Sequence, residues 1–338
     1  MALQSSGAIS ALQINAVFGR GTDLNTYRGT TRFRAGSTMS PFPTGAIAYA
    51  DFYGTTPRAP FLAVNILVVG GGGGGGSSSG AGGTGGGGGG VINATYNALP
   101  GGSYSVVVGG GGGTNSSGGT SSLSGGGVSI AAGGGGGGRT GGSAAGGVSV
   151  ITNTLTHSRG GSQGGGVNAD WAGVAGAGGG GATTAGNTWG GSKRTVNQGE
   201  RGGRGYRWSN GLWYSSGGGG GGSNFNNDVT NSGGWSAGVN GGNGNETSNA
   251  RPADGSDVGG RGASSFSSPI NATPALANRG GGGGGTGGGG RGAPSAGGSG
   301  VVVIRYVGSS ALASGGNITI PGDGYVYHTF ASSGTFTL

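Results

Sequence analysis

Apolar residues in this 338-residue chain are concentrated in short runs, and several of these runs lead into uninterrupted glycine. Residues 61–69 are almost wholly apolar and are followed by seven consecutive glycines at 70–76. Residues 103–108 and 128–131 are shorter pieces of the same kind, and residues 300–307 close the region with β-branched side chains. β-Branched and aromatic residues favour strands. The pattern therefore predicts β-strands that alternate with glycine segments.

Glycine dominates the composition between these strands. The chain has 100 glycines but only 10 prolines, which excludes collagen, because collagen requires a strict Gly-X-Y period and abundant proline. A glycine run can adopt the extended polyproline II conformation, and several runs can pack side by side through backbone hydrogen bonds. The sequence therefore predicts a mainly β and polyglycine II fold, a glycine-rich helix sandwich framed by β-strands. A flexible Gly/Ser linker is the alternative. Further runs occupy residues 85–90, 109–113, 133–138, 217–222 and 280–285.

The two ends of the chain differ from this glycine-rich region. Residues 1–60 contain two segments led by Ile, which close on Phe18-Gly19 and on Phe52-Tyr53-Gly54. Their apolar spacings of three and four predict short capped helices, with Ser10 and Asp51 as polar punctuation. The last residues alternate apolar and polar positions around a Pro-Gly-Asp-Gly turn and predict two or three β-strands.

The composition thus divides the chain into three expected parts. Residues 1–60 form an N-terminal module, residues 61–307 form the glycine-rich sandwich, and residues 308–338 form a C-terminal β-hairpin. Within the second part, we expect loops at about 165–260 to project from the far end of the scaffold.

Residues that carry catalytic chemistry are sparse. His157 and His328 are the two histidines, and neither has a cluster of carboxylates beside it in the sequence. A triad or a metal site needs several convergent groups, and the nine acidic residues are scattered. We therefore expect no enzyme activity, no metal and no cofactor.

Charge and targeting signals limit the partners. The net charge of +8 favours anionic partners. Arg-Gly-Gly triplets occur, but they are isolated between glycine runs rather than repeated in tandem, so we expect no nucleic acid partner. The first ten residues do not resemble a signal peptide, and no run of about 18 apolar residues is present. We expect neither secretion nor membrane insertion.

The tryptophans are the strongest candidates for a binding surface. All five lie between residues 171 and 235, together with tyrosine and arginine. Trp, Tyr and Arg are the residues that most often anchor interfaces, although the same side chains can instead form a small core that caps the glycine segments. The receptor-binding candidates are Trp171, Trp189, Arg204, Tyr206, Arg207, Trp208, Trp213, Tyr214 and Trp235.

Three motifs together resemble the prokaryotic and phage glycine-rich domain family. They are Ile-Leu-Val-Val-Gly-Gly-Gly-Gly at 66–73, Ser-Gly-Val-Val-Val-Ile-Arg-Tyr at 299–306, and the Thr-Phe-Thr ending at 327–337. That family is abundant in phage tail proteins and is similar to the tip adhesins of long tail fibres in T-even-like phages. In the family the Thr-Phe-Thr strand usually precedes the Leu-Val-Val-Gly strand, whereas here it ends the chain. The last strands therefore pair either within this chain or with a neighbouring copy.

The resemblance implies a virion structural protein, a tail-fibre or tail-tip adhesin. The loops would bind an outer-surface protein or glycan of the host, and the N-terminal module, which resembles a small repeat of phage structural proteins, would attach to other tail proteins. Such a protein is assembled in the host cytoplasm and resides in the virion tail. Fibre proteins are typically trimers, but tip adhesins can be single copies. The alternatives are a purely structural head or tail component without receptor binding, and an ice-binding glycine-rich protein.

Overall fold

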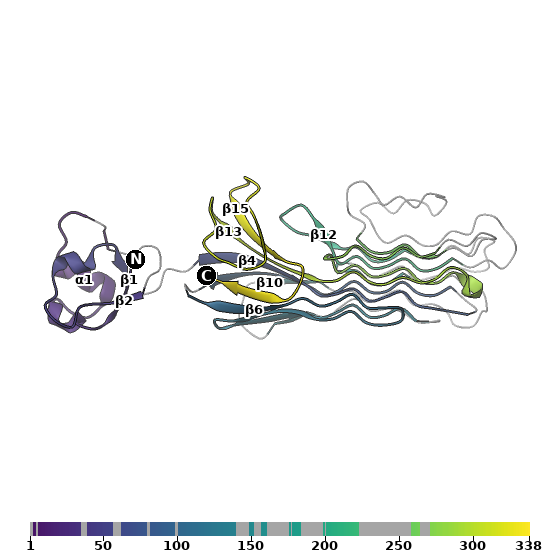
Figure 1. The fold of residues 1–338 in the computed structure, drawn as a ribbon, viewed down its shortest axis with the longest axis horizontal. Helices are drawn as coiled ribbons and strands as arrows, with labels where there is room; N and C mark the ends of the chain where they lie inside the picture. The colour runs from purple at the N-terminus through teal and green to yellow at the C-terminus, as the bar shows by residue number, and fades with distance from the viewer. Residues whose placement is uncertain are drawn as a thin grey trace.

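The computed structural model is mainly β, as predicted, and α1 is the one α-helix among its described residues (Figure 1). No helix among the described residues is long and apolar enough to cross a membrane. The structure describes residues 3–4, 6–34, 39–56, 62–79, 82–98, 101–139, 149–151, 157–160, 176, 178–183, 199, 201–222, 258–263 and 271–338.

The N-terminal residues contain the predicted capped helix. Helix α1 (Ala11–Phe18) begins at Ser10, whose side chain accepts a hydrogen bond from the Gln13 N–H at 3.3 Å, while the Gln13 side chain accepts from the Ser10 N–H at 2.8 Å. This reciprocal capping box satisfies N–H groups at the start of the helix. The helix ends at Gly19, whose φ of 69° lies in the left-handed region that favours glycine. The second predicted helix is a single 3₁₀ turn, η2 (Tyr49–Phe52).

An aromatic cluster holds these N-terminal elements together. The rings of Phe18, Tyr27, Phe42 and Phe52 contact one another, and their centroids are 4.4 to 6.2 Å apart. The buried Arg32 guanidinium lies 4.5 Å from the centre of the Phe42 ring. The remaining elements here are η1 (Leu24–Tyr27) and a three-stranded sheet of β1 (Thr31–Arg34), β2 (Met39–Pro41) and β3 (Thr55–Thr56).

Two antiparallel sheets pack face to face in the rest of the molecule. The six-stranded sheet has the order β10-β5-β4-β13-β15-β14, and the five-stranded sheet has the order β16-β6-β7-β8-β9. The first contains β10 (His157–Gly160), β5 (Val91–Ala98), β4 (Leu62–Val69), β13 (Val301–Val307), β15 (Tyr325–Phe330) and β14 (Asn317–Thr319). The second contains β16 (Gly334–Thr337), β6 (Ser103–Val107), β7 (Ser121–Gly125), β8 (Val128–Ala132) and β9 (Ser149–Ile151).

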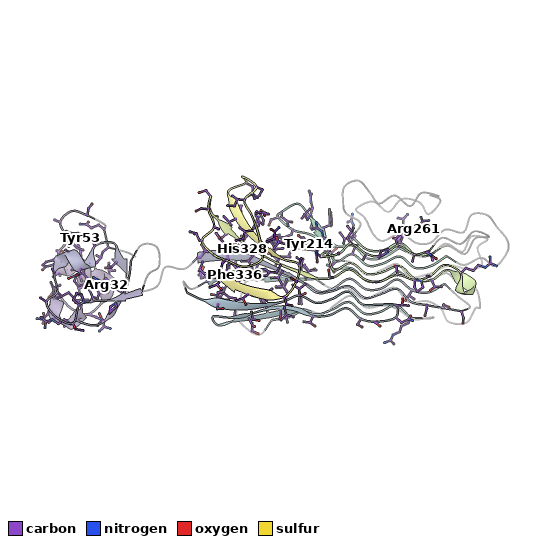
Figure 2. The ribbon with its side chains drawn as sticks, in the orientation of Figure 1. Arg32, Tyr53, Tyr214, Arg261, His328 and Phe336 are labelled. Atoms are coloured by element: carbon purple, nitrogen blue, oxygen red, sulfur yellow. The ribbon has the colours of Figure 1, made fainter. Side chains whose placement is uncertain are left out.

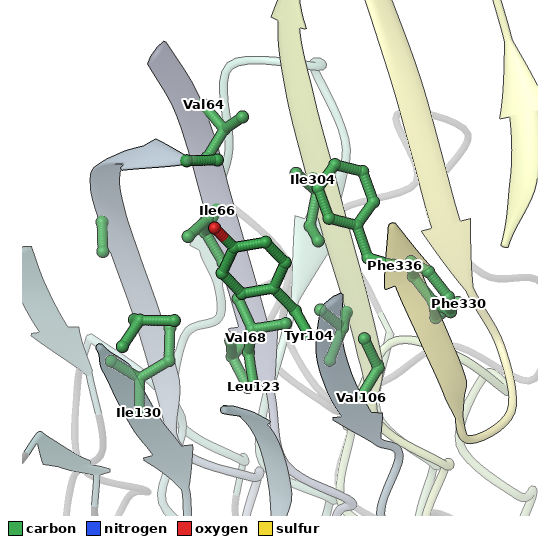
Figure 3. Close-up of a cluster of buried hydrophobic side chains, with 14 of the residues drawn as sticks. Val64, Ile66, Val68, Tyr104, Val106, Leu123, Ile130, Ile304, Phe330 and Phe336 are labelled. Atoms are coloured by element: carbon green, nitrogen blue, oxygen red, sulfur yellow. The ribbon is translucent and has the colours of Figure 1, made fainter. Parts of the chain in front are cut away.

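The main hydrophobic core lies between these sheets (Figure 3). Alternate residues of a strand point to opposite faces of the sheet, so Val64, Ile66 and Val68 of β4 face the five-stranded sheet, where they meet residues such as Leu123 and Ile130. All five are at most 3 % exposed. The burial of these β-branched and aliphatic side chains explains why the predicted strands at the two ends of the glycine-rich region lie side by side.

The C-terminal strands pair within the chain. Strand β15 pairs with β13 through six residues, and Ile304 lies opposite His328. Strand β16 crosses to the other sheet and pairs with β6, where Phe336 lies opposite Tyr104. Both aromatic rings are buried in the main core.

The glycine runs continue the strands as extended segments along the long axis of the molecule (Figure 1). Residues 70–76, which follow β4, donate backbone hydrogen bonds of 2.8 to 2.9 Å to three neighbouring segments in turn, and every third residue returns to the same neighbour. The bonds run from Gly70, Gly73 and Gly76 to residues 84–90, from Gly71 and Gly74 to residues 116–119, and from Gly72 and Gly75 to residues 295–298.

Close approach of these backbones is what requires glycine. A Cβ atom added at Gly72 or Gly75 would overlap the carbonyl oxygen of Gly281 or Gly284, respectively. Neither oxygen belongs to a flexible side chain that can move aside. At the outer surface glycine is not required for close packing, because a Cβ added at Gly110 meets nothing within 4 Å. We call the hydrogen-bonded glycine segments the glycine bundle.

The predicted helix sandwich is wrong. The described part of the fold is built from antiparallel sheets, and its glycine runs are not helices that form a separate sandwich. The β-strands determine the fold class, because their side chains form most of the two hydrophobic clusters outside the N-terminal residues. The glycine segments extend from the ends of those strands and bond sideways to their neighbours.

Candidate functional site

A short hairpin lies on the outer face of the six-stranded sheet. It consists of β11 (Tyr206–Arg207) and β12 (Trp213–Tyr214), which pair antiparallel. Its turn contains Asn210 and Gly211, a pair typical of turns: Gly211 has a φ of 80°, and the Asn210 side chain accepts a hydrogen bond from the Leu212 N–H at 3.1 Å. These features fix the local path of the chain.

Trp208 anchors this hairpin to the sheet. Its side chain is 3 % exposed, and its indole N–H donates to the Asn93 side-chain oxygen on β5 at 3.0 Å. Its ring meets the Tyr327 ring edge-on at 6.5 Å between centroids. An indole N–H that is buried without a partner is costly, so Asn93 provides a specific docking contact for the hairpin.

Tyr214 is the second anchor. It is 2 % exposed, its hydroxyl accepts a hydrogen bond from the Asn210 side chain at 2.9 Å, and the Arg279 guanidinium lies 5.1 Å from its ring centre. Burial raises the pKa of this hydroxyl. Figure 2 places Tyr214 where the strands give way to the glycine bundle. The cluster that it joins comprises Leu67, Val69, Val91, Ala182, Trp208, Tyr214, Val301, Val303 and Tyr327.

The structure therefore separates the six described receptor-binding candidates. Trp208 and Tyr214 lie in the core. Arg204 and Arg207 are exposed, and Tyr206 and Trp213 are half-buried at the edge of the hairpin. The other three candidates, Trp171, Trp189 and Trp235, lie outside the described residues. A receptor-binding role for the nine residues stays a prediction.

Arg305 is a central residue that the sequence reasoning missed. Its guanidinium lies 4.2 Å from the centre of the Tyr325 ring and 5.0 Å from that of Trp208, and it donates to the Tyr327 hydroxyl at 3.2 Å. Arg over aromatic faces is a stabilising arrangement. The sequence does show Arg305 as a single charge within the apolar run 301–307. Only the fold shows which aromatic rings surround its guanidinium.

Tyr327 connects this arginine to Asp323. The Tyr327 hydroxyl donates to a carboxylate oxygen of Asp323 at 2.6 Å, and the Tyr325 N–H donates to the other oxygen at 3.0 Å. These donations hold the pKa of the Asp323 carboxyl below its usual range, the tyrosine hydroxyl being the larger cause. Burial, followed by the bond to Asp323, raises the pKa of Tyr327. The chain of contacts from Asp323 through Tyr327 and Arg305 to Trp208 stiffens the support beneath the hairpin.

His328 is buried on the opposite face of β15. One ring nitrogen lies 2.8 Å from the Gly315 carbonyl oxygen and the other lies 3.1 Å from the Tyr306 hydroxyl. That hydroxyl accepts from the Leu312 N–H at 2.8 Å, so its own proton is directed to the histidine. A neutral ring that donates from Nδ1 to Gly315 satisfies every group, and burial lowers the pKa of His328. The side chain of His157 lies outside the described residues.

The described residues hold no group of three or more His, Cys, Asp or Glu side chains placed to bind a metal ion. Their polar clusters instead connect strands and support the β11–β12 hairpin.

Comparison with known proteins gives one family. The model of the family described as a glycine-rich domain matches residues 51–307, which is most of the chain. No curated protein matches the sequence. The matched range contains the hairpin, both of its anchors and the glycine bundle.

Proposed function

The chain belongs to the glycine-rich domain family, and we propose that it is a structural protein of a bacteriophage tail that binds a receptor on the host-cell surface. It is a tail-fibre or tail-tip adhesin and not an enzyme. The matched family by itself names neither phages nor receptors, so the proposal rests on the motif resemblance and on the geometry of the hairpin.

The observation that carries the proposal is the contrast between the two sides of the β11–β12 hairpin. Its inner side is fixed by the buried Trp208 and Tyr214, whereas Arg207 on β11 and Arg204, which lies two residues before β11, are exposed. Recognition commonly uses loops that a rigid scaffold holds in place. An exposed arginine on a fixed hairpin offers several donors to a carboxylate or phosphate without a large ordering cost. The partner is an anionic or polar outer-surface protein or glycan.

The other parts have supporting roles in this proposal. The glycine bundle is the stiff scaffold, and the N-terminal module attaches the protein to other tail proteins. In that module Leu12 is 73 % exposed and Tyr49 is 44 % exposed, which leaves apolar surface for a neighbour. The protein is assembled in the host cytoplasm and resides in the virion tail.

A purely structural tail or head component is the second candidate. It is favoured by the burial of Trp208 and Tyr214, because two of the aromatic residues expected to contact a receptor instead pack against the sheet. In that case Arg204 and Arg207 have no role in recognition.

Binding of the purified full-length chain to cells tests the proposal. The protein is labelled and titrated onto cells that a virion carrying this chain infects, and competition with virion adsorption is measured. We expect saturable binding that weakens at least about tenfold in the double variant Arg204→Ala/Arg207→Ala, since charge-assisted hydrogen bonds are the strong ones. The matched control is Arg20→Ala/Arg28→Ala, which removes the same charge from exposed positions of the N-terminal module.

The outcomes separate the two candidates. Binding that competes with adsorption and depends on Arg204 and Arg207 supports the adhesin. Absence of saturable binding to those cells contradicts it, and virions that still incorporate the double variant and adsorb normally favour the purely structural role.

A further inference from the structure

A pocket opens where the glycine bundle ends, away from the β11–β12 hairpin. It has a volume of about 510 Å³ and lies beside the short helix η3 (Gly288–Gly290), which Figure 1 shows at the far end of the glycine segments. The lining residues are Ser77, Ser78, Ser79, Thr286, Gly290, Gly292, Ala293 and Pro294. Pockets for small ligands commonly occupy about 300 to 1,000 Å³.

One wall of the pocket is fixed by the bundle. Ser77 directly follows the segment 70–76, and its N–H donates to the Asn115 side-chain oxygen at 2.8 Å. Thr286 donates to the Gly76 carbonyl oxygen twice, from its N–H at 2.9 Å and from its hydroxyl at 3.0 Å. These bonds hold Thr286 and the serine wall, which we define as Ser77, Ser78 and Ser79, in one arrangement before any ligand binds.

The facing wall is formed by residues 290–294. A Cβ added at Gly290 would lie 3.6 Å from the Ser78 carbonyl oxygen, so this glycine directly faces the serine wall. The Ala293 N–H donates to the Asn271 side-chain oxygen at 2.9 Å, which fixes the chain next to Pro294. This wall therefore supplies a small apolar surface opposite the hydroxyls.

Ser78 carries the decisive observation. Ser78 is 7 % exposed as a whole residue. Its hydroxyl is buried and has no hydrogen-bond partner among the groups that the structure describes. Buried polar groups in native proteins are almost always paired, so an orphan hydroxyl in the lining of a pocket points to a ligand that supplies the partner. None of the eight lining residues is charged, which favours a neutral ligand.

We propose that this pocket binds one neutral sugar unit of a host-surface glycan. Sugar hydroxyls both donate and accept, which matches a lining of serine and threonine hydroxyls, and the Ala293–Pro294 surface suits the C–H face of the ring. The inference deepens the proposed function, on which it rests for its biological partner. The sugar itself is recognised by the protein alone, so the two proposals can fail separately.

The test uses the full-length protein and free sugars, without cells. Saturation-transfer NMR is recorded with glucose, galactose, mannose and N-acetylglucosamine, and with glucuronate as a charged probe. We expect saturable binding of at least one neutral sugar and a loss of at least tenfold in affinity in Ser78→Ala. Ala293→Leu, which fills the pocket from an exposed position, gives a similar loss.

Ser216→Ala is the matched control, because Ser216 also has a buried hydroxyl without a partner but lies in the bundle and does not line the pocket. It leaves sugar binding unchanged. Neither serine variant lowers the melting temperature, because each removes an unpaired group. Saturable neutral-sugar binding that both pocket variants abolish supports the proposal. It is overturned if no neutral sugar binds, if glucuronate alone binds, or if the pocket variants bind as well as the unchanged protein.

Discussion

The strands and the glycine bundle are two regions of one chain that cohere in opposite ways. Between the sheets, side chains such as Ile66 and Leu123 fill the space and backbones stay apart. In the bundle, most residues are glycines without a side chain, and backbones approach until a single added Cβ no longer fits. The same chain passes from one regime to the other between Val69 and Gly70. Hydrophobic burial and backbone hydrogen bonding can therefore be tested separately by substitution.

Adding one methyl group inside the bundle should lower the stability of the protein most. Gly75→Ala places a Cβ onto the carbonyl oxygen of Gly284, and the displacement of a hydrogen-bonded backbone segment costs more than about 3 kcal/mol. Chemical denaturation followed by circular dichroism measures the change. Gly110→Ala is the control at the bundle surface, and we expect it to change stability by less than about 0.5 kcal/mol. Equal losses of stability in Gly75→Ala and Gly110→Ala would mean that the glycine runs are a loose tract and not a packed bundle.

Removing side-chain volume from the other region has the next largest effect. Ile66 is fully buried between the sheets, and Ile66→Ala leaves a cavity that costs about 2 to 5 kcal/mol. Val307→Ala, at a position that is 72 % exposed, serves as the control and costs less than about 0.5 kcal/mol. Both values come from the same denaturation assay. A mild effect of Ile66→Ala would mean that the glycine bundle, rather than the core, supplies most of the stability.

The junction of the two regions responds to loss of one hydrogen bond. Trp208→Phe removes the indole N–H that donates to the half-buried Asn93 side chain, and loss of this hydrogen bond costs about 0.5 to 1.5 kcal/mol. Hydrogen exchange should show faster exchange in residues 206–214 with little change in the bundle. Trp213→Phe, at a half-buried position, is the control. Loss of protection across both regions in Trp208→Phe would show that the strands and the bundle unfold as one unit.

A weak dependence of stability on pH should come from the strand region. Burial lowers the pKa of His328 in the folded protein, whereas the unfolded chain protonates with an ordinary pKa of about 6.5. Stability is therefore full above that pH and falls below it, as the unfolded state binds the proton, with a slope of at most about 1.4 kcal/mol per pH unit. Denaturation between pH 7.5 and 5 measures the slope, and His328→Gln should flatten it. An unchanged slope in that variant would place the titrating group elsewhere.

The local elements were the predictable part of the fold. β-Branched runs located β4 and β13 within a residue or two, and Ser10 located the start of α1. The helix sandwich was wrong because composition reports what a glycine run can adopt and not how it joins the strands on either side. The pairing of β15 with β13, and of β16 with β6, depends on contacts between distant segments that no local pattern encodes.

The candidate site was predicted in composition but not in arrangement. The sequence singled out the aromatic and arginine residues of 204–214, yet it did not distinguish the buried Trp208 from the exposed Arg207. That distinction depends on Asn93 and Arg305, which lie far from the hairpin in the sequence. The pocket beside Ser78 gave no signal at all, because serine next to glycine is common throughout this chain.

Amide hydrogen exchange within the glycine runs distinguishes a packed glycine bundle from solvated linkers. The N–H groups of Gly72, Gly73 and Gly75 donate to neighbouring segments, whereas those of Gly110 and Gly113 have no acceptor in the part of the chain that the structure describes. We expect the first group to exchange at least about 1,000-fold more slowly than the second, because opening them requires the bundle to separate. Uniformly fast exchange in all five glycines would mean that the runs are solvated linkers and not a packed bundle.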